Sequence, residues 1–486
     1  MHLPSVIPAQ PPARPGETAS SGPALPSRLA TPAAGACAEA LLARTGGASA
    51  LATALQASRR DTLALFATFE QALPGLRVAQ RAELNPPLWE LGHIGWFQDF
   101  WLARNPQRAM GPRADPDAPR AAARRADADA LYNSSWVPHD SRWALPLPGA
   151  DATRAELAAQ LADSLALLAT LGGQEDGGSA GGSAGGAVGS AAGSAVDQSI
   201  ATDDTLYFFR LALLHEDMHH EAALYMAQHL GIAIDDPRWQ AAPLPEPPPP
   251  CHIEPGPWRL GSDPGAGFAF DNELGAHDVA LGATTLDAQV VRWAEYLPFV
   301  DAGGYDDERW WTDAGRAWRA DQPHPIGLGA PRYLRRTPDA GGNAAGRSAC
   351  MAAPPGNAWQ HWRHGRWQAL DLRQPACHLT HHEAQAWCRW AGRRLPAEAE
   401  WERAALSQPA LFRWGDVWEW TASPFAPFPG FVPHPYRDYS APWFDGRPVL
   451  RGASFMTQPR LRHPRYRNYF PAGRNDVPAG FRSCAR

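Results

Sequence analysis

The pattern of apolar residues changes at a proline-rich segment, residues 243–250, and this change restricts the chain to a fold of two parts. Before the segment, apolar residues recur every three or four positions over long stretches, which predicts amphipathic helices. After it come short strand-like runs, glycine-rich turns and scattered aromatic residues. We therefore predict an α+β protein, with a helical bundle at residues 58–245 followed by a mixed domain with much irregular structure at residues 251–486.

Four helices are expected to form the bundle, with a long connection between the second and the third. The first begins near Asp61. The second has Pro86 and Pro87 in its first turn, where a missing N–H costs little. The third opens at Thr153 and Glu156, which have the spacing of a capping box. The fourth contains residues 211–226.

Two segments have compositions that do not predict a packed core. Residues 1–57 are rich in Pro, Ala, Ser and Gly, and we expect them to be largely disordered apart from an Ala/Leu helix near 37–57. Residues 172–199 are dominated by Gly, Ala and Ser, which predicts a flexible insertion between the third and fourth helices.

Two histidines of the fourth helix lie one turn apart on its apolar side. His215 and His219 are four residues apart, so their imidazoles point the same way. His93 lies among apolar residues of the second helix, and facing helices of a bundle can gather such rings around a metal. Histidines with this spacing also occur on solvated faces, and a lone histidine is commonly a hydrogen-bonded core residue. We predict a metal site at His93, His215 and His219, with Zn(II), Fe(II), Cu(II) and Ni(II) all suitable.

Three polar neighbours of these histidines allow two interpretations. Asp217 and Glu221 have the position of acceptors that orient ligating rings, but carboxylates on a helix surface are the commoner case, and we favour that interpretation. His220 lies off the shared face and is not expected to be a ligand.

Charge, cysteine content and hydropathy exclude several classes of protein. The formal net charge is −6 without a sustained basic run, which argues against nucleic-acid binding. The six cysteines are scattered, a pattern that fits free thiols in a reducing compartment. Neither a signal peptide nor a run long enough to span a membrane is evident, and we expect a soluble, cytoplasmic protein without membrane partners.

Four motifs of the second part resemble those of the formylglycine-generating-enzyme-like (sulfatase-modifying) fold. They are HLTHHEAQAWCRWAGRRLPAEAEWE at 378–402, GDVWEWT at 415–421, VLRGAS at 449–454 and AGFR at 479–482. Joined to a DinB-like four-helix bundle with His93, His215 and His219, this arrangement resembles the ergothioneine sulfoxide synthases. The resemblance implies Fe(II) on the three histidines, O2 as co-substrate, and hercynine (Nα-trimethylhistidine) as the substrate whose imidazole C2 is joined to sulfur.

Other segments are similar to the selenoneine synthase branch of that family. They are NPPLWELGH at 85–93, LYNSSWVPH at 131–139, HEDMH at 215–219, HPYRDYS at 434–440 and HPRYRNYF at 463–470. Some sulfoxide synthases have tyrosines where this chain has Ser135 and Trp136, and others have glutamine at the position of Met218. The branch implies a selenosugar as the donor.

The resemblance also implies roles for residues of the second part. Tyr436 matches a tyrosine proton donor, with a packed loop tyrosine as the alternative. Tyr439, Asn468 and Tyr469 match hercynine contacts, and Phe470 adds an aromatic face for the trimethylammonium group.

Other polar residues of the chain have less specific interpretations. Arg474 is expected to bind an anionic donor and Arg482 to stabilise the fold. His139 and His434 allow two interpretations, a place in the wall of the donor pocket or the solvated position usual for loop histidines, and we favour the second. A closely spaced C-terminal cysteine pair of the kind used by formylglycine generators is missing from the sequence, which argues against oxidation of a sulfatase cysteine.

Three functional hypotheses follow. The main one is an Fe(II)- and O2-dependent synthase that joins selenium from a selenosugar to hercynine. The alternative joins sulfur from cysteine or γ-glutamylcysteine. The third is a binding protein without catalytic activity, in which the histidines are structural or hold zinc.

Overall fold

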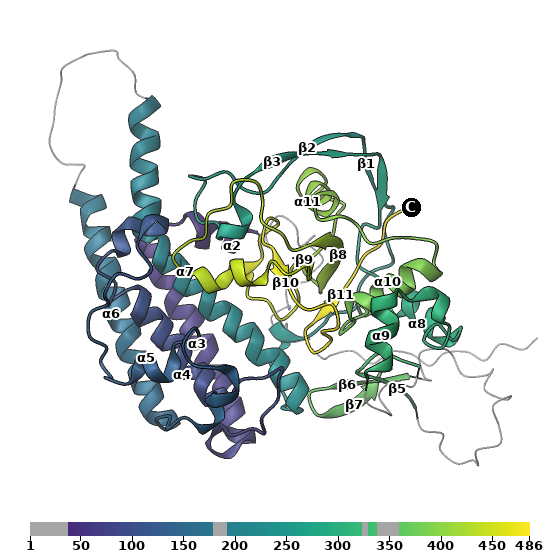
Figure 1. The fold of residues 1–486 in the computed structure, drawn as a ribbon, viewed down its shortest axis with the longest axis horizontal. Helices are drawn as coiled ribbons and strands as arrows, with labels where there is room; N and C mark the ends of the chain where they lie inside the picture. Colours follow the sequence, from purple (N-terminus) through teal and green to yellow (C-terminus); the bar gives the residue numbers. More distant parts are fainter. Residues whose placement is uncertain (1–36, 178–191, 323–328, 338–358) are drawn as a thin grey trace, which may run out of the picture. The chain divides into compact units, whose positions relative to one another are not determined.

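The computed structural model describes residues 37–177, 192–322, 329–337 and 359–486, with the backbone alone for 172–177 and 192–202. Helices make up the first part of the chain, and short strands and helices make up the second (Figure 1). This confirms the predicted α+β class and the order of its two parts. Among the described residues, no helix is both long and apolar enough to cross a membrane.

Four long helices form the bundle. They are α3 (Ala48–Ala72), α4 (Pro87–Trp101), α6 (Ala150–Gly177) and α7 (Ala192–Leu230). Helices α3 and α4 each pack against both α6 and α7, which is the arrangement of a four-helix bundle. The shorter helices α2 (Ala38–Thr45) and α5 (Ala128–Tyr132) flank it. Aromatic and aliphatic side chains fill the space between the four helices.

The described strands of the second part form four small sheets. The largest has the order β10-β9-β8-β11, in which β8 and β11 are parallel and the other pairs antiparallel. The strands are β1 (Cys251–Ile253), β2 (Gly256–Leu260), β3 (His277–Leu281), β4 (Thr284–Leu286), β5 (Leu334–Arg336), β6 (Trp359–Arg363), β7 (Arg366–Ala369), β8 (Trp418–Pro424), β9 (Pro448–Gly452), β10 (Asn468–Tyr469) and β11 (Ala479–Gly480). The helices are α8 (Trp293–Asp301), α9 (Asp313–Ala320), α10 (His381–Trp390) and α11 (Glu398–Ser407).

The predicted start of the folded part at residue 58 is too late. Helix α2 begins at Ala38 and α3 at Ala48, so residues 38–57 are mostly helical. The expected Ala/Leu helix is present there, but the backbone leaves the helix at Gly46, which ends α2. Burial of Leu51 and Leu55 in the core and the ion pair of buried Arg44 with Glu273 explain why this segment is ordered. Residues 1–36 lie outside the described residues.

Two details of the third and fourth helices differ from the predictions. Helix α6 begins at Ala150, three residues before Thr153, whose hydroxyl donates to the Gly149 carbonyl (3.1 Å), so Thr153 does not cap the helix. The predicted insertion at 172–199 is helical at both ends, because α6 extends to Gly177 and α7 starts at Ala192. Its middle, residues 178–191, lies outside the described residues.

Candidate metal centre and substrate cavity

Helices α4 and α7 bring three histidines together in the bundle. One nitrogen each of His93, His215 and His219 lies within 4.8 Å of the others, and the described part of the chain contains no other such group of metal-binding side chains. The Nε2 atoms of His215 and His219 are 3.1 Å apart. Two nitrogens bound to one metal at about 2.1 Å and at a right angle would be about 3 Å apart, so this spacing fits a shared cation.

Hydrogen bonds orient two of the three rings. Nδ1–H of His93 donates to the Tyr132 carbonyl (2.8 Å), which leaves Nε2 of that ring free to face the other histidines. Nδ1 of His219 contacts the carboxylate of Glu90, which lies one turn before His93 on α4. Such outer partners fix the tautomer of a ligating histidine and make it a better ligand. The His215 ring is stacked on Phe97 at 3.5 Å between centroids.

Burial favours the neutral, metal-binding form of His93 and His215. Burial, followed by repulsion from His219, lowers the pKa of His93 to about 3. Burial also lowers the pKa of His215 well below its ordinary value. For Glu90, burial would raise the pKa, but attraction to His219 and the hydrogen bond with it bring the pKa down to about 2. Two neutral imidazoles, His93 and His215, therefore lie in a site that also holds the charged carboxylate of Glu90, and this set of groups suits a divalent transition metal.

Asp217 and Glu221 are buried, so the prediction of surface carboxylates is wrong. Asp217 accepts two hydrogen bonds from Arg460 (2.8 and 2.9 Å) and one from Ser58 (2.7 Å). In the described contacts, neither carboxylate orients a ligand ring. Both instead hold α7 to the second part of the chain.

Glu221 accepts hydrogen bonds from the first residue of β8 and from the segment that follows β9. Its Oε1 accepts hydrogen bonds from Trp418, Ser454 and Thr457 at 2.7 to 2.9 Å. The neighbouring His220 points away from the site and packs against Trp239. It does not belong to the group of three histidines.

A cavity of about 250 Å³ lies beside His219. Helix α7 lines one side, and segments of the second part line the other, including four of the residues expected to contact substrate. These four are Tyr439, Asn468, Tyr469 and Phe470. Pairing of Asn468 and Tyr469 with β9 fixes the backbone of this wall. The rest of the wall includes Met218, Glu221, Tyr225, Trp418 and Tyr466.

Tyr436 lies close to His215 but does not line this cavity. Its ring is 6.0 Å from that of His215 and 4.9 Å from that of Phe97, edge to face in both cases. Burial raises the pKa of Tyr436 above its ordinary value, so its hydroxyl keeps its proton at neutral pH.

Two arginines have roles that their contacts define. Both sides of the Arg474 fork bind Asp476, and its guanidinium lies between the rings of Tyr225 and Phe470. Arg474 is not among the residues that line the cavity, and it therefore packs behind the cavity wall. Arg482 is buried against Glu419, the contact expected of a residue that stabilises the fold.

The two loop histidines are partly buried and have hydrogen-bond partners. Nε2 of His139 donates to the Leu84 carbonyl (2.7 Å). Nδ1 of His434 is 2.9 Å from the Tyr207 hydroxyl. Neither lines the cavity beside His219.

Sequence reasoning missed Glu90 and Tyr466 as parts of the site. The sequence could have indicated Glu90, because a residue three positions before His93 lies on the same face of a helix. Tyr466 had only its place in the HPRYRNYF motif.

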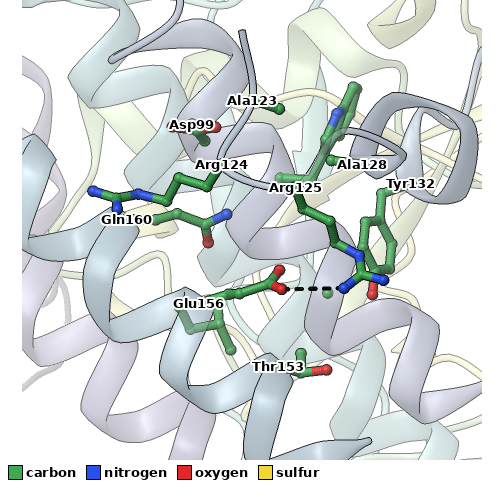
Figure 2. Close-up of a pocket in the computed structure, with 12 residues that line it drawn as sticks. Asp99, Ala123, Arg124, Arg125, Ala128, Tyr132, Thr153, Glu156 and Gln160 are labelled. Carbon is green, nitrogen blue, oxygen red and sulfur yellow. Dashed lines mark ion pairs between the residues drawn. The ribbon is translucent and has the colours of Figure 1, made fainter. Parts of the chain in front are cut away.

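A second, much smaller pocket lies between α4, α6 and the segment leading into α5. Figure 2 shows Arg125 and Glu156 facing one another across it, 3.6 Å apart. Its volume of about 10 Å³ is enough for about one water molecule. A substrate the size of an amino acid does not fit there.

Two family profiles match the two parts of the chain. The DinB superfamily matches residues 54–223, and the sulfatase-modifying factor enzyme 1-like domain matches residues 239–414. The first match begins inside α3 and contains all three histidines of the site.

Comparison with individual proteins extends over most of the chain. The hercynine oxygenase of Mycolicibacterium smegmatis is 30% identical over 455 residues, covering 82% of this chain and 90% of that relative. The hercynine oxygenase of Mycobacterium tuberculosis is 29% identical over 450 residues, with coverages of 82% and 90%. The formylglycine-generating enzyme of Streptomyces coelicolor is 32% identical over 167 residues, 33% of this chain and 48% of that enzyme. The extent of the first match shows that the chain belongs to the hercynine oxygenase family.

Proposed function

We propose that the protein is an O2-dependent enzyme that acts on hercynine at a metal held by His93, His215 and His219. The observation that carries the proposal is the position of these histidines, since His219 lines an aromatic cavity large enough for a modified amino acid. The relatives that span most of the chain are named for the same substrate.

The cavity wall suits the groups of hercynine. A trimethylammonium group has no N–H to donate and binds best against aromatic faces, which Tyr439, Tyr469 and Phe470 provide. The buried carboxylate of Glu221 lines the same cavity and complements the positive charge. The amide of Asn468 can donate hydrogen bonds to the substrate carboxylate.

The proposed metal is Fe(II), as the family resemblance implies. When bound, it would supply the reactivity toward O2 and an open position for substrate. Glu90 and the Tyr132 carbonyl hold two of the ligand rings in the metal-binding orientation. The ring of Tyr436 packs edge to face on that of His215, and its hydroxyl, which the raised pKa keeps protonated at neutral pH, is the proposed proton donor.

We propose a thiol, cysteine or γ-glutamylcysteine, as the donor that is joined to imidazole C2. The support is family membership across 82% of the chain. The motifs similar to the selenoneine synthase branch predict a selenosugar instead, and the described contacts do not distinguish the two donors. The five described cysteines are free thiols, which supports a reducing compartment such as the cytoplasm.

The experiment offers hercynine and O2 to anaerobically purified, Fe(II)-loaded protein with cysteine, γ-glutamylcysteine or a selenosugar in parallel. Mass spectrometry identifies the products, and Zn(II)-loaded protein is the control. Product from a thiol alone supports the proposal, and product from the selenosugar alone replaces the proposed donor by the selenium donor. If no donor gives product, the enzyme hypothesis fails and the zinc-holding alternative gains support.

A further inference from the structure

The short helix α5 is held against α4 beside the ligand histidine of that helix. The carboxylate of Asp129 accepts a hydrogen bond from the indole N–H of Trp96 (2.7 Å) and pairs with Arg104 (2.7 Å). The indole N–H of Trp89 donates to the Leu131 carbonyl (2.8 Å). These contacts fix both ends of α5 to α4, and none of them involves the histidine itself.

The same two tryptophans restrain the plane of the His93 ring. The rings of Trp89 and Trp96 stack on it, at 4.7 and 5.5 Å between centroids. A rotation of the imidazole by 180° about its Cβ–Cγ bond keeps that plane but changes which way its nitrogens face. Stacking therefore does not decide which nitrogen of His93 faces the other two histidines.

The carbonyl of Tyr132 makes that decision. Tyr132 is the last residue of α5, and the last carbonyls of a helix have no partner within it. This carbonyl accepts the Nδ1–H of His93 (2.8 Å), so the proton lies on Nδ1 and the lone pair on Nε2.

Gly92 allows α5 to come close enough for this hydrogen bond. A Cβ atom at position 92 would lie closer than 3.0 Å to three atoms of the Tyr132 side chain, including its hydroxyl oxygen. The Tyr132 side chain is only 2% exposed, so its ring has no free space into which it could move. A larger residue at 92 would push Tyr132 away from α4, and its carbonyl with it.

We propose that Gly92 and Tyr132 are positioning residues of the metal centre, which act through His93. The close approach at Gly92 places the Tyr132 carbonyl, and that carbonyl selects the ring orientation and the tautomer in which Nε2 of His93 is the ligand atom. This inference rests on the metal site of the proposed function and adds residues that do not touch the metal. Outer partners of this kind affect metal affinity and site geometry together.

The test compares Gly92→Ala with Gly95→Ala in the full chain. Co(II) is the probe, because its visible absorption reports the arrangement of its ligands. Gly92→Ala should lower Co(II) affinity about 10- to 100-fold and shift the absorption bands. Gly95 is the matched control on the same helix, since a Cβ there would crowd Gln160 and Leu157 of α6 instead of α5. Gly95→Ala should keep the affinity and the spectrum, even where its melting temperature falls.

Two further variants keep the test decisive if Gly92→Ala folds poorly. Tyr132→Leu keeps the backbone carbonyl and makes room for a Cβ at 92, so Gly92→Ala/Tyr132→Leu should recover most of the affinity and the wild-type spectrum. Asp129→Asn removes the charge that holds α5 to Arg104 without any steric clash. It should lower Co(II) affinity in the same direction, toward the lower end of the same range.

The outcomes separate this inference from the proposed function. If the wild-type protein binds no divalent metal at the three histidines, the proposed function fails and takes this inference with it. If the wild-type protein binds Co(II) and Gly92→Ala binds it equally well with the same spectrum, the positioning role is overturned and the proposed function stands. Equal losses in Gly92→Ala and Gly95→Ala, no recovery in the double variant, or an unchanged affinity of Asp129→Asn would each overturn it too.

Discussion

The bundle and the second part of the chain position their site residues by different means. In the bundle, the ligand histidines lie on two regular helices, and partners within the bundle, the Tyr132 carbonyl and Glu90, orient two of the rings. In the second part, the site residues lie on short strands and irregular segments. Buried ion pairs stabilise that scaffold, namely Arg451–Glu402, Arg467–Glu398 and Arg482–Glu419.

The difference separates metal binding from substrate binding. All three ligands and their partners belong to the bundle, so metal affinity should be a property of the bundle. The cavity has walls from both parts, so substrate affinity depends on how α7 is held against the second part. Asp217 and Glu221, which alternate with the ligands along α7, make that connection.

The largest effect should follow removal of a ligand. His215→Ala is expected to lower metal affinity by more than the roughly 10- to 100-fold that loss of an outer partner costs, and to abolish activity. The metal content of the variant after dialysis measures the loss of affinity. His220→Gln is the control, since His220 faces Trp239, and it should keep one metal per chain. Full metal loading of His215→Ala would contradict the assignment.

Tyr436→Phe tests whether the second part contributes chemistry without contributing to metal binding. We expect kcat to fall roughly 10²- to 10⁴-fold, because a proton donor is lost, while metal affinity stays the same. Single-turnover rates measure the chemical step, and metal titration measures the metal affinity. An unchanged kcat would make Tyr436 a packed loop residue.

Arg460→Met tests the connection between the two parts. Asp217 is fully buried, and loss of its charged partner should destabilise the protein by about 3–5 kcal/mol in urea unfolding. The double variant Arg460→Met/Asp217→Asn should recover part of this loss. Arg259→Met, which breaks an ion pair exposed on both sides, should leave unfolding unchanged. Equal effects of Arg460→Met and Arg259→Met would show that the buried pair does not hold α7 in place.

Glu90→Gln tests the outer partner of His219. The amide keeps the size of the side chain but removes the charge, and we expect metal affinity to fall about 10- to 100-fold. Glu156→Gln, at the small pocket of Figure 2, is the matched control and should bind metal normally. Metal competition with a chelator gives both affinities.

The smallest effect concerns acid stability of the second part. Burial lowers the pKa of His381 to about 4, and the unfolded chain has an ordinary histidine pKa near 6.5. Between these values the unfolded state binds the extra proton, so stability should fall as the pH is lowered from about 6.5 to 4. His381→Gln keeps a donor for the Thr421 carbonyl without titrating, and it should flatten the dependence of melting temperature on pH by a few degrees. An identical pH profile for variant and wild type would exclude His381 as a contributor.

The amino-acid sequence alone determined the two-part organisation and the histidine face of α7. Helical periodicity and the i, i+4 spacing of His215 and His219 are local properties, which depend on backbone geometry and not on distant contacts. The ends of elements were less well determined. Thr153 has the spacing of a cap, yet the helix starts earlier, at Ala150, and the Thr153 hydroxyl donates to the Gly149 carbonyl inside its first turn.

Only the tertiary structure decided what the buried polar groups do. Asp217 and Glu221 look like surface residues of a helix, and their donors, such as Arg460 and Trp418, lie about 200 residues or more away in the chain. The Tyr466 hydroxyl donates to the sulfur of Met218, which lies 248 positions away in the chain. A buried carboxylate or hydroxyl must find a partner, and which partner it finds depends on how distant segments pack, a property that no local pattern contains.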